Sequence, residues 1–350
     1  MATTCQRYKR ERHIAELAVQ RAAILTEAVY YSQVKQTLTK DDKSPVTLAD
    51  FGAQALVLAA LATAFPDDKY IGEEDSAGLR TNPELSALVF DAVARTLKSN
   101  KQGASNINLG TMGSEQEMWD FIDLGNHDAT AAGRVWTLDP IDGTKGFLRG
   151  GQYAIALALL VDGVVQVGVL GCPHLSSEGE EGIILSAVRG QGVVVKQMSA
   201  DLNSILHPSE ISMSRVPTAE ASFCEGVEAG HSAHELQAKI ANDLGISKAT
   251  VRMDSQAKYA SIAMGQGEIY LRLPTKMTYE EKIWDHAAGV VIIEEAGGIV
   301  VDMYCEPLDF TQGRTLKRNK GVVALPRGIF GDVMEVVTRN ALEKYGKSAL

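Results

Sequence analysis

The stretch Asp139-Pro-Ile-Asp142-Gly-Thr144 places two carboxylates three positions apart, with a hydroxyl close behind them. Because a residue before proline is disfavoured in the helical region, Asp139 should continue the extended strand predicted over residues 135–138. Asp142-Gly143 is typical of a turn, and Thr144 then falls at the N-cap or in the first turn of a helix, where backbone N–H groups are free. Carboxylates, a hydroxyl and free amides at one turn are suited to bind cations together with a phosphate.

Three other structures share part of this pattern. A surface turn of the Asp-Gly type looks similar when it stands alone. An EF-hand is excluded, because its loop needs alternating oxygen ligands and a glutamate at its last position. A haloacid-dehalogenase phosphatase has a single residue between its two aspartates, whereas Pro140 and Ile141 both separate Asp139 from Asp142. The extra residue redirects the second side chain, so that chemistry is not expected.

Further acidic residues could join this turn in space. The strand predicted at Tyr70-Ile71 ends in Gly72-Glu73-Glu74-Asp75, which is either a solvated acidic loop or a set of ligands at a strand end. Asp50 falls in the first turn of a predicted helix, where the helix dipole alone would favour a carboxylate. Asp285 lies at the start of another predicted helix. Because ligands collect at strand ends in such sheets, it could face the Asp139–Asp142 turn across a crevice between two halves.

Composition excludes several classes of protein. The formal net charge of -10 over 350 residues argues against a nucleic acid polymer as partner, because affinity for nucleic acids is built mostly from lysine and arginine. The cysteines, Cys5, Cys172, Cys224 and Cys305, form no Cys-x-x-Cys pair, which indicates neither a zinc site nor a disulfide framework. The apolar run 154–161 is too short to span a bilayer, and no targeting segment is recognised. We therefore expect a cytoplasmic protein without membrane contact.

The first half of the chain is predicted to hold two long helices and an antiparallel sheet. Helices are expected over residues 14–34, 47–65 and 85–97, the second with a capping box from Thr47 to Asp50. Asp162-Gly163 and residues 189–192 are predicted hairpin turns within a sheet from 134 to 196. The polar, proline-interrupted stretch 197–212 is the candidate boundary, and we expect domains at 1–205 and 206–350.

The second half alternates strands with helices, which favours a parallel or mixed sheet covered on both faces. Gly297-Gly298 is the expected end of the helix that follows Asp285. Strands are predicted over 222–227, 251–253, 268–273, 299–302 and 321–325, and helices over 232–244, 255–264, 283–295 and 328–345.

Three segments in this order resemble a known family: Gly72-Glu73-Glu-Asp, Asp139-Pro-Ile-Asp142-Gly-Thr144 and Trp284-Asp285-His-Ala-Ala-Gly. Together they are similar to the lithium-sensitive, magnesium-dependent phosphatases of the inositol monophosphatase superfamily. Gly226-Val-Glu-Ala-Gly-His231-Ser, Asp254-Ser255-Gln-Ala-Lys258-Tyr259 and Tyr270-Leu-Arg272-Leu-Pro resemble its 3′(2′),5′-bisphosphate nucleotidase branch in particular. The resemblance covers nearly the whole chain and implies an α/β fold, a layered α-β-α-β-α sandwich. Relatives often carry Ser where this chain has Asp75, which leaves the role of Asp75 open.

The resemblance also implies a metal centre and a catalytic pair. Metal ligands would be the carboxylates of Glu73, Asp139, Asp142 and Asp285 with the backbone carbonyl of Ile141, holding two to three Mg²⁺ ions; Li⁺, and also Na⁺, would inhibit. Magnesium chemistry agrees, since this hard cation takes carboxylate, carbonyl, water and phosphate oxygens. Asp50 would accept the hydroxyl proton of Thr144, whose oxygen then orients the attacking water, so that no phosphoenzyme is needed.

Substrate contacts are implied for a further set of side chains: Thr144, His231, Ser255, Lys258, Arg272 and Asp285. Read alone, Lys258 and Arg272 are more often solvated surface cations, and His231 is more often a residue at a helix start. Substrates of this branch carry two phosphates, one cleaved at the metals and one held elsewhere, for which a basic pair is suited.

We therefore expect a metal-dependent phosphatase that removes the 3′-phosphate of adenosine 3′,5′-bisphosphate to give AMP, and that also acts on 3′-phosphoadenylyl sulfate. The resemblance links this activity to sulfate assimilation and salt tolerance. The substrate would be a small nucleotide, and the protein is expected to be a monomer. Two alternatives stay open: an inositol polyphosphate 1-phosphatase, and a nucleotide sensor with weak catalysis.

Overall fold

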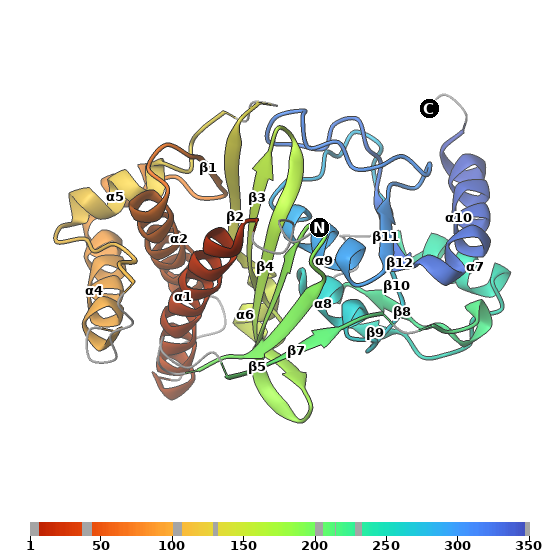
Figure 1. Ribbon diagram of the computed structural model, residues 1–350, viewed down its shortest axis with the longest axis horizontal. Coiled ribbons are helices and arrows are strands. Elements are labelled where there is room, and N and C mark those ends of the chain that lie inside the picture. The colour runs from red at the N-terminus through yellow and green to blue at the C-terminus, as the bar shows by residue number, and fades with distance from the viewer. Residues whose placement is uncertain are drawn as a thin grey trace.

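The computed structural model describes residues 7–36, 44–100, 107–128, 132–199, 206–213, 215–227 and 233–346. His231 lies outside these ranges. The described chain is arranged in alternating layers of helices and sheets in the order α-β-α-β-α, as the sequence predicts (Figure 1).

The first sheet has seven strands in sequence order, and its only parallel pair among the described residues is β1 with β2. From β2 onward each strand pairs antiparallel with the next, which confirms the predicted antiparallel sheet. Asp162 and Gly163 both have positive φ, as the expected two-residue turn requires. The strands are β1 (Lys69–Gly72), β2 (Arg134–Asp142), β3 (Ala154–Val161), β4 (Val164–Ser177), β5 (Glu180–Val188), β6 (Val193–Gln197) and β7 (Leu206–Ile211).

Helices cover both faces of this sheet, because β3 is apolar on both of its faces. Ile155 and Leu157 point to a core shared with α1 and α2, whereas Ala156 and Ala158 point to a core shared with α8 and α9. The helices of the first half are α1 (Lys9–Gln36), α2 (Ser44–Ala64), α3 (Ala77–Thr81), α4 (Pro83–Asn100), α5 (Glu115–Asp123) and α6 (Thr144–Arg149).

The second sheet has five strands in the order β11-β12-β10-β8-β9, with parallel pairs around β8 and antiparallel pairs around β12. It is therefore mixed, as predicted. α8 and α9 lie between the sheets, and α7 and α10 cover the outer face (Figure 1). The elements are β8 (Phe223–Glu225), β9 (Val251–Arg252), β10 (Ile269–Arg272), β11 (Gly298–Val301), β12 (Val322–Pro326), α7 (His234–Asp243), α8 (Ala257–Ala263), α9 (Ala287–Glu295) and α10 (Phe330–Tyr345).

Several boundaries differ from the predictions. The capping box at Thr47 is wrong, because α2 already begins at Ser44, with Pro45 in the first turn where its fixed φ is tolerated. The short helices α3 and α5 were not expected. α9 begins at Ala287, so Asp285 stands before the helix.

The stretch 197–212, expected to be irregular, contains β7, whose pairing with β6 makes it the last strand of the first sheet. The chain therefore leaves that sheet after Ile211, beyond the expected boundary at 205. The division into two domains stays a prediction.

One described helix, α2 from Val46 to Ala64, is long and apolar enough to cross a membrane. Its apolar window is 78% buried within the protein, which is typical of a core helix. Length and composition therefore give only weak support for a membrane span.

Candidate metal centre

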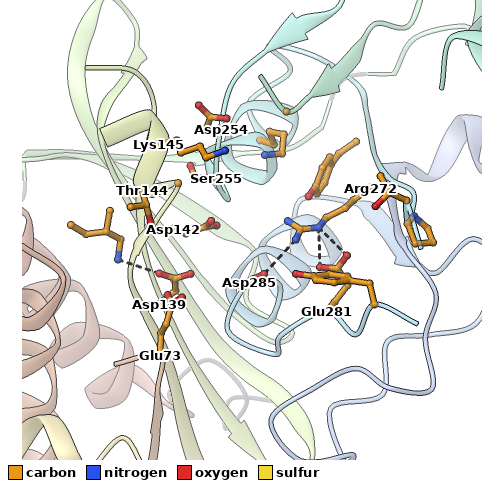
Figure 2. A pocket seen from close by; sticks show the side chains of 18 of the residues that line it. Glu73, Asp139, Asp142, Thr144, Lys145, Asp254, Ser255, Arg272, Glu281 and Asp285 are labelled. Atoms are coloured by element: carbon orange, nitrogen blue, oxygen red, sulfur yellow. Dashed lines mark hydrogen bonds and ion pairs between the residues drawn. The ribbon is translucent and has the colours of Figure 1, made fainter. Parts of the chain in front are cut away.

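A cavity of about 570 Å³ lies between the two halves, and acidic residues from both line it. Figure 2 shows Glu73, Asp139 and Asp142 on one side and Asp285 on the other. The structure thus brings together residues that are far apart in sequence, as predicted. Of the predicted site residues, the cavity is lined by Glu73, Asp139, Ile141, Asp142, Thr144, Ser255, Lys258, Arg272 and Asp285.

The end of β2 bears three of these residues. Its pairing with β3 shifts register between Asp139 and Asp142, so the strand bends where the ligands stand. An oxygen of Asp139 accepts the backbone N–H of Ile141 at 3.1 Å. Asp142 accepts the backbone N–H of Gln256, from the other half, at 2.6 Å. Each carboxylate therefore has one oxygen fixed by a hydrogen bond.

Gly143 allows the chain to turn from β2 into α6. Its φ of 92° lies in the left-handed region, and a Cβ there would stand 2.8 Å from the Cβ of Ser255. Glycine is thus required for both the turn and the close approach of the second half. Thr144 follows as the first residue of α6, exposed to the cavity, which agrees with the predicted first-turn position.

Glu73 follows β1 directly, and its neighbours are held by α2. Gln54, fully buried, donates to the carbonyl of Glu74 at 2.6 Å and accepts the Glu74 N–H at 3.1 Å. Of the three consecutive acids, only Glu73 lines the cavity. Asp75 accepts the N–H of Ala77 at 2.9 Å, so it stabilises the start of α3.

Asp50 is buried on α2, and its charge acts on Asp139. It does not line the cavity, and no hydrogen bond joins it to Thr144 in the described part of the chain. Burial, followed by the charges of Glu74 and Glu73, raises the pKa of Asp50 well above its usual range. The catalytic pair of Asp50 and Thr144 stays a prediction.

The opposite wall is organised around Arg272. Its Nε donates to Glu281 at 2.9 Å, and its Nη2 lies 3.6 Å from Asp285 (Figure 2). Glu281 also contacts the buried His286 at 3.2 Å, which in turn bonds Tyr259 at 2.9 Å. Both ring nitrogens of His286 therefore contact protein groups, which indicates a structural role.

The four predicted ligands repel one another electrostatically. Enclosure by protein atoms raises the pKa of Glu73 to about 7, although part of its side chain stays open to the cavity, and Asp285 and Glu74 contribute further. Burial raises the pKa of Asp285 to about 6 against the opposing charge of Arg272. Burial, then Glu73 and Asp142, raises the pKa of Asp139 well above its usual range. Such a cluster is stabilised by cations, and its all-oxygen donor set suits Mg²⁺.

The predicted ligands lie farther apart than the ligands of a single compact metal site. In the described chain, the residues whose candidate ligand atoms all lie within 4.8 Å of one another are Glu281, Asp285 and His286. Glu281 is already neutralised by Arg272, which helps to lower its pKa to about 2 against the effect of burial. The predicted ligands are spread more widely, as expected of carboxylates that serve more than one ion.

The two predicted phosphate-binding cations have different surroundings. Lys258 is buried on α8, with its Nζ 5.3 Å from the ring centre of Tyr270 and 3.5 Å from the carbonyl of Met253. Burial lowers its pKa, and Asp142 opposes this shift. Arg272 already pairs with Glu281. A phosphate of the ligand would therefore pair more readily with Lys258 than with Arg272.

Sequence reasoning missed other residues that line the cavity: Val46, Lys145, Leu148, Asp254, Tyr279 and Glu281. Lys145 could have been found, because it directly follows Thr144. No local pattern separates Glu281 from Glu280. The two glutamates differ only in their tertiary contacts: Glu281 pairs with Arg272, whereas Glu280 binds Thr315 at the surface.

The layered fold and the carboxylate cavity between two sheets define an enzyme of the metal-dependent phosphatase class. The chain belongs to the inositol monophosphatase family, which it matches over residues 9–330. Members of this family depend on metal ions, typically Mg²⁺.

Two relatives that are about half identical to this chain are named 3′(2′),5′-bisphosphate nucleotidases. The protein of Emericella nidulans is 49% identical over 349 residues, which cover 95% of this chain and 98% of the relative. That of Schizosaccharomyces pombe is 50% identical over 337 residues, covering 93% and 94%. Among solved structures, the inositol monophosphatase of Zymomonas mobilis superposes with a TM-score of 0.61 at 18% identity, covering 95% of this chain and 99% of that one. This last likeness concerns the fold alone.

Proposed function

We propose that this protein is a 3′(2′),5′-bisphosphate nucleotidase that hydrolyses the 3′-phosphate of adenosine 3′,5′-bisphosphate to AMP and phosphate. The observation that carries the proposal is the cavity that carboxylates of both halves line together with Lys258 and Arg272. Its volume of about 570 Å³ is within the range of ~300–1,000 Å³ typical of small-molecule sites. The names of the relatives support the nucleotide as substrate.

Each group in the cavity has a role in this proposal. Two to three Mg²⁺ ions would be held by Glu73, Asp139, Asp142, Asp285 and the carbonyl of Ile141. Bound cations lower the pKa of water and neutralise phosphate oxygens, which is most of the catalysis in phosphoryl transfer. Thr144 orients the attacking water and passes its hydroxyl proton to Asp50.

Substrate binding is assigned to Thr144, His231, Ser255, Lys258, Arg272 and Asp285. Ser255 is buried two residues before α8, with a φ of 64°. A non-glycine residue with positive φ costs free energy and is concentrated at functional sites. The buried ammonium of Lys258 is the group best placed for the phosphate that is not cleaved.

The proposal extends to properties that follow from the same site. The enzyme also hydrolyses 3′-phosphoadenylyl sulfate, which links it to sulfate assimilation and salt tolerance. Li⁺ inhibits because it matches Mg²⁺ in size but supplies a single charge, and Na⁺ inhibits more weakly. The protein works as a monomer in the cytoplasm.

The test is phosphate release from adenosine 3′,5′-bisphosphate, 3′-phosphoadenylyl sulfate and an inositol polyphosphate at equal concentrations, with Mg²⁺ and with a chelator. We expect Mg²⁺-dependent release from the two nucleotides and AMP as the product of the first. Preference for the inositol compound would identify a polyphosphate 1-phosphatase. Tight binding of nucleotide without turnover would identify a sensor.

Inhibition by Li⁺ is measured in the same assay at several Mg²⁺ concentrations. It should be uncompetitive or non-competitive toward the nucleotide and should depend on Mg²⁺. Insensitivity at every Mg²⁺ concentration would contradict the proposed ion site.

A further inference from the structure

Arg314 lies in the segment between β11 and β12, yet its backbone is joined to the stretch that leads to Asp285. The carbonyl of Arg314 accepts the N–H of Ile283 at 3.2 Å, and the N–H of Leu316 donates to Glu281 at 2.8 Å. Between them, Lys282 and Thr315 form an antiparallel bridge. The backbone of Arg314 is therefore tied directly to the segment that leads to Asp285.

The side chain of Arg314 crosses to the other half. Its Nη2 donates to the carbonyl of Gly72 at 2.6 Å, and its Nη1 donates to the carbonyls of Gly125 at 3.0 Å and His127 at 3.3 Å. Gly72 is the last residue of β1, and its own N–H donates to Gly125 at 2.9 Å. The guanidinium thus holds the backbone next to Glu73.

The same guanidinium also contacts Trp284, the residue before Asp285. Its Cζ lies 4.9 Å from the centre of the Trp284 ring, which is 94% buried. Cation–π contact and three carbonyl acceptors require a planar group with donors in fixed directions, which arginine supplies and lysine does not. Within the described part of the chain, the hydrogen bonds of Arg314 go to backbone carbonyls, so they fix the position of the backbone.

We propose that Arg314 is a positioning residue of the metal centre, which fixes the end of β1 carrying Glu73 to the Trp284–Asp285 segment of the other half. The inference rests on the proposed function in that Glu73 and Asp285 are taken as metal ligands. With Arg314 in place, carboxylates from the two halves stand opposite each other before a cation binds. Because the end of β1 and the Trp284–Asp285 segment are already held in place, a cation does not have to order them when it binds. The affinity for the cation is therefore higher.

The test is calorimetric titration of the full-length protein with Mg²⁺, and with Mn²⁺ as a second probe, in the absence of nucleotide. Arg314→Met removes the donors but keeps much of the side-chain volume. Residues that orient metal ligands typically change metal affinity by roughly 10–100-fold, and we expect a loss of this size. Arg314→Lys keeps the charge but not the planar fork of donors, so its loss should be intermediate.

Arg318→Met is the matched control. Arg318 is in the same segment, its side chain is 71% exposed, and it pairs with Asp309 at 3.3 Å, away from both ligand segments. Its Mg²⁺ affinity should equal that of the wild type. The melting temperature without metal is measured for every variant, so that loss of affinity is separated from loss of stability.

Unchanged Mg²⁺ affinity in a folded Arg314 variant would overturn the proposal, as would an equal loss in Arg318→Met. A lower melting temperature with unchanged affinity, or failure of both Arg314 variants to fold, would assign Arg314 to stability alone and also overturn it. A wild type that binds Mg²⁺ but hydrolyses no bisphosphate contradicts the proposed function while leaving this inference standing.

Discussion

Asp142 has one carboxylate oxygen bound to the backbone N–H of Gln256 at 2.6 Å, which leaves the other for a cation. Asp142→Asn keeps an oxygen acceptor for Gln256 but removes the charge. We expect turnover to fall by more than the roughly 10–100-fold typical of residues that only orient ligands, with the fold intact. Circular dichroism and the phosphate assay check this together. Either an active variant or an unfolded one would contradict the assignment.

The catalytic role of the Thr144 hydroxyl is tested by comparing a variant without the hydroxyl with one that keeps it. Thr144→Ala should lower kcat by roughly 10²–10⁴-fold, because it removes the group that orients water, with little change in Mg²⁺ affinity. Thr144→Ser keeps the hydroxyl and should retain more activity than the alanine variant. An alanine variant within a few-fold of wild type would remove Thr144 from the mechanism.

Substitutions of Lys258 and Arg272 should have different kinetic effects, although the sequence analysis treats these two residues as a pair. The uncleaved phosphate keeps its charge during the reaction, so its contact with Lys258 should affect mainly KM. Lys258→Ala is expected to raise KM for the bisphosphate by about 10–150-fold, the equivalent of roughly 1.5–3 kcal/mol for one charge-assisted contact. Arg272→Ala should also lower kcat, because it removes the cation that pairs with both Glu281 and Asp285.

Adenosine 3′-monophosphate is the control substrate for both variants, since it lacks the 5′-phosphate. Wild type should hydrolyse it poorly, and Lys258→Ala should do so no worse. Equal loss on both substrates in Lys258→Ala would place this lysine in the metal site or the fold instead.

At the scale of elements, the site depends on how β2 passes into α6. Gly143 and Gly133, at the two ends of β2, both have positive φ, of 92° and 85°. A Cβ on Gly143 would meet Ser255 at 2.8 Å, whereas a Cβ on Gly133 would meet nothing within 4 Å. Alanine substitutions at these two glycines therefore distinguish the cost of backbone strain, which both share, from the loss of contact between the halves, which affects Gly143 alone.

Both alanine variants should lose about 1–2 kcal/mol of unfolding free energy to the left-handed conformation. Gly143→Ala should lose more, because it also pushes Ser255 away, and it should lower activity while Gly133→Ala does not. Chemical denaturation and the phosphate assay measure the two effects. Equal stability and activity in both variants would show that the approach to Ser255 is unimportant.

At the scale of the whole molecule, the carboxylate cluster makes stability depend on pH and metal together. The folded-state pKa values of Glu73, about 7, and Asp285, about 6, exceed their ordinary values of 4.5 and 3.8. Between these limits the metal-free folded protein binds more protons than the unfolded chain. Its stability therefore falls as pH rises from about 4 to about 7.

Mg²⁺ should remove this penalty, so the rise in melting temperature on adding it should be larger at pH 7.5 than at pH 5. His174 gives up its proton in an overlapping window, since Glu27 raises its pKa although burial opposes this, but that effect is independent of metal. Differential scanning fluorimetry with and without Mg²⁺ isolates the cluster. A metal-induced shift that is the same at both pH values would contradict the assignment.

Local sequence determined much of this protein. The hydrophobic period, the turn pairs and Pro140 predicted the long helices, both hairpins and the extended backbone at Asp139, because these features depend on side chains within a few positions of one another. The strand was expected to end there, but β2 continues to Asp142 through a shift in register. The resemblance added the layered fold and the metal ligands, since the motifs carry the ligand set from distant parts of the chain.

Tertiary structure decided the rest. β7 is a strand only because β6 offers it an edge, and Arg272 differs from Lys258 only because Glu281 packs against it. Arg314 stands far in sequence from Gly72 and Trp284, so no window of sequence indicates that it joins them. These outcomes depend on which backbone groups and charges meet when the two halves pack together, and local patterns do not contain that information.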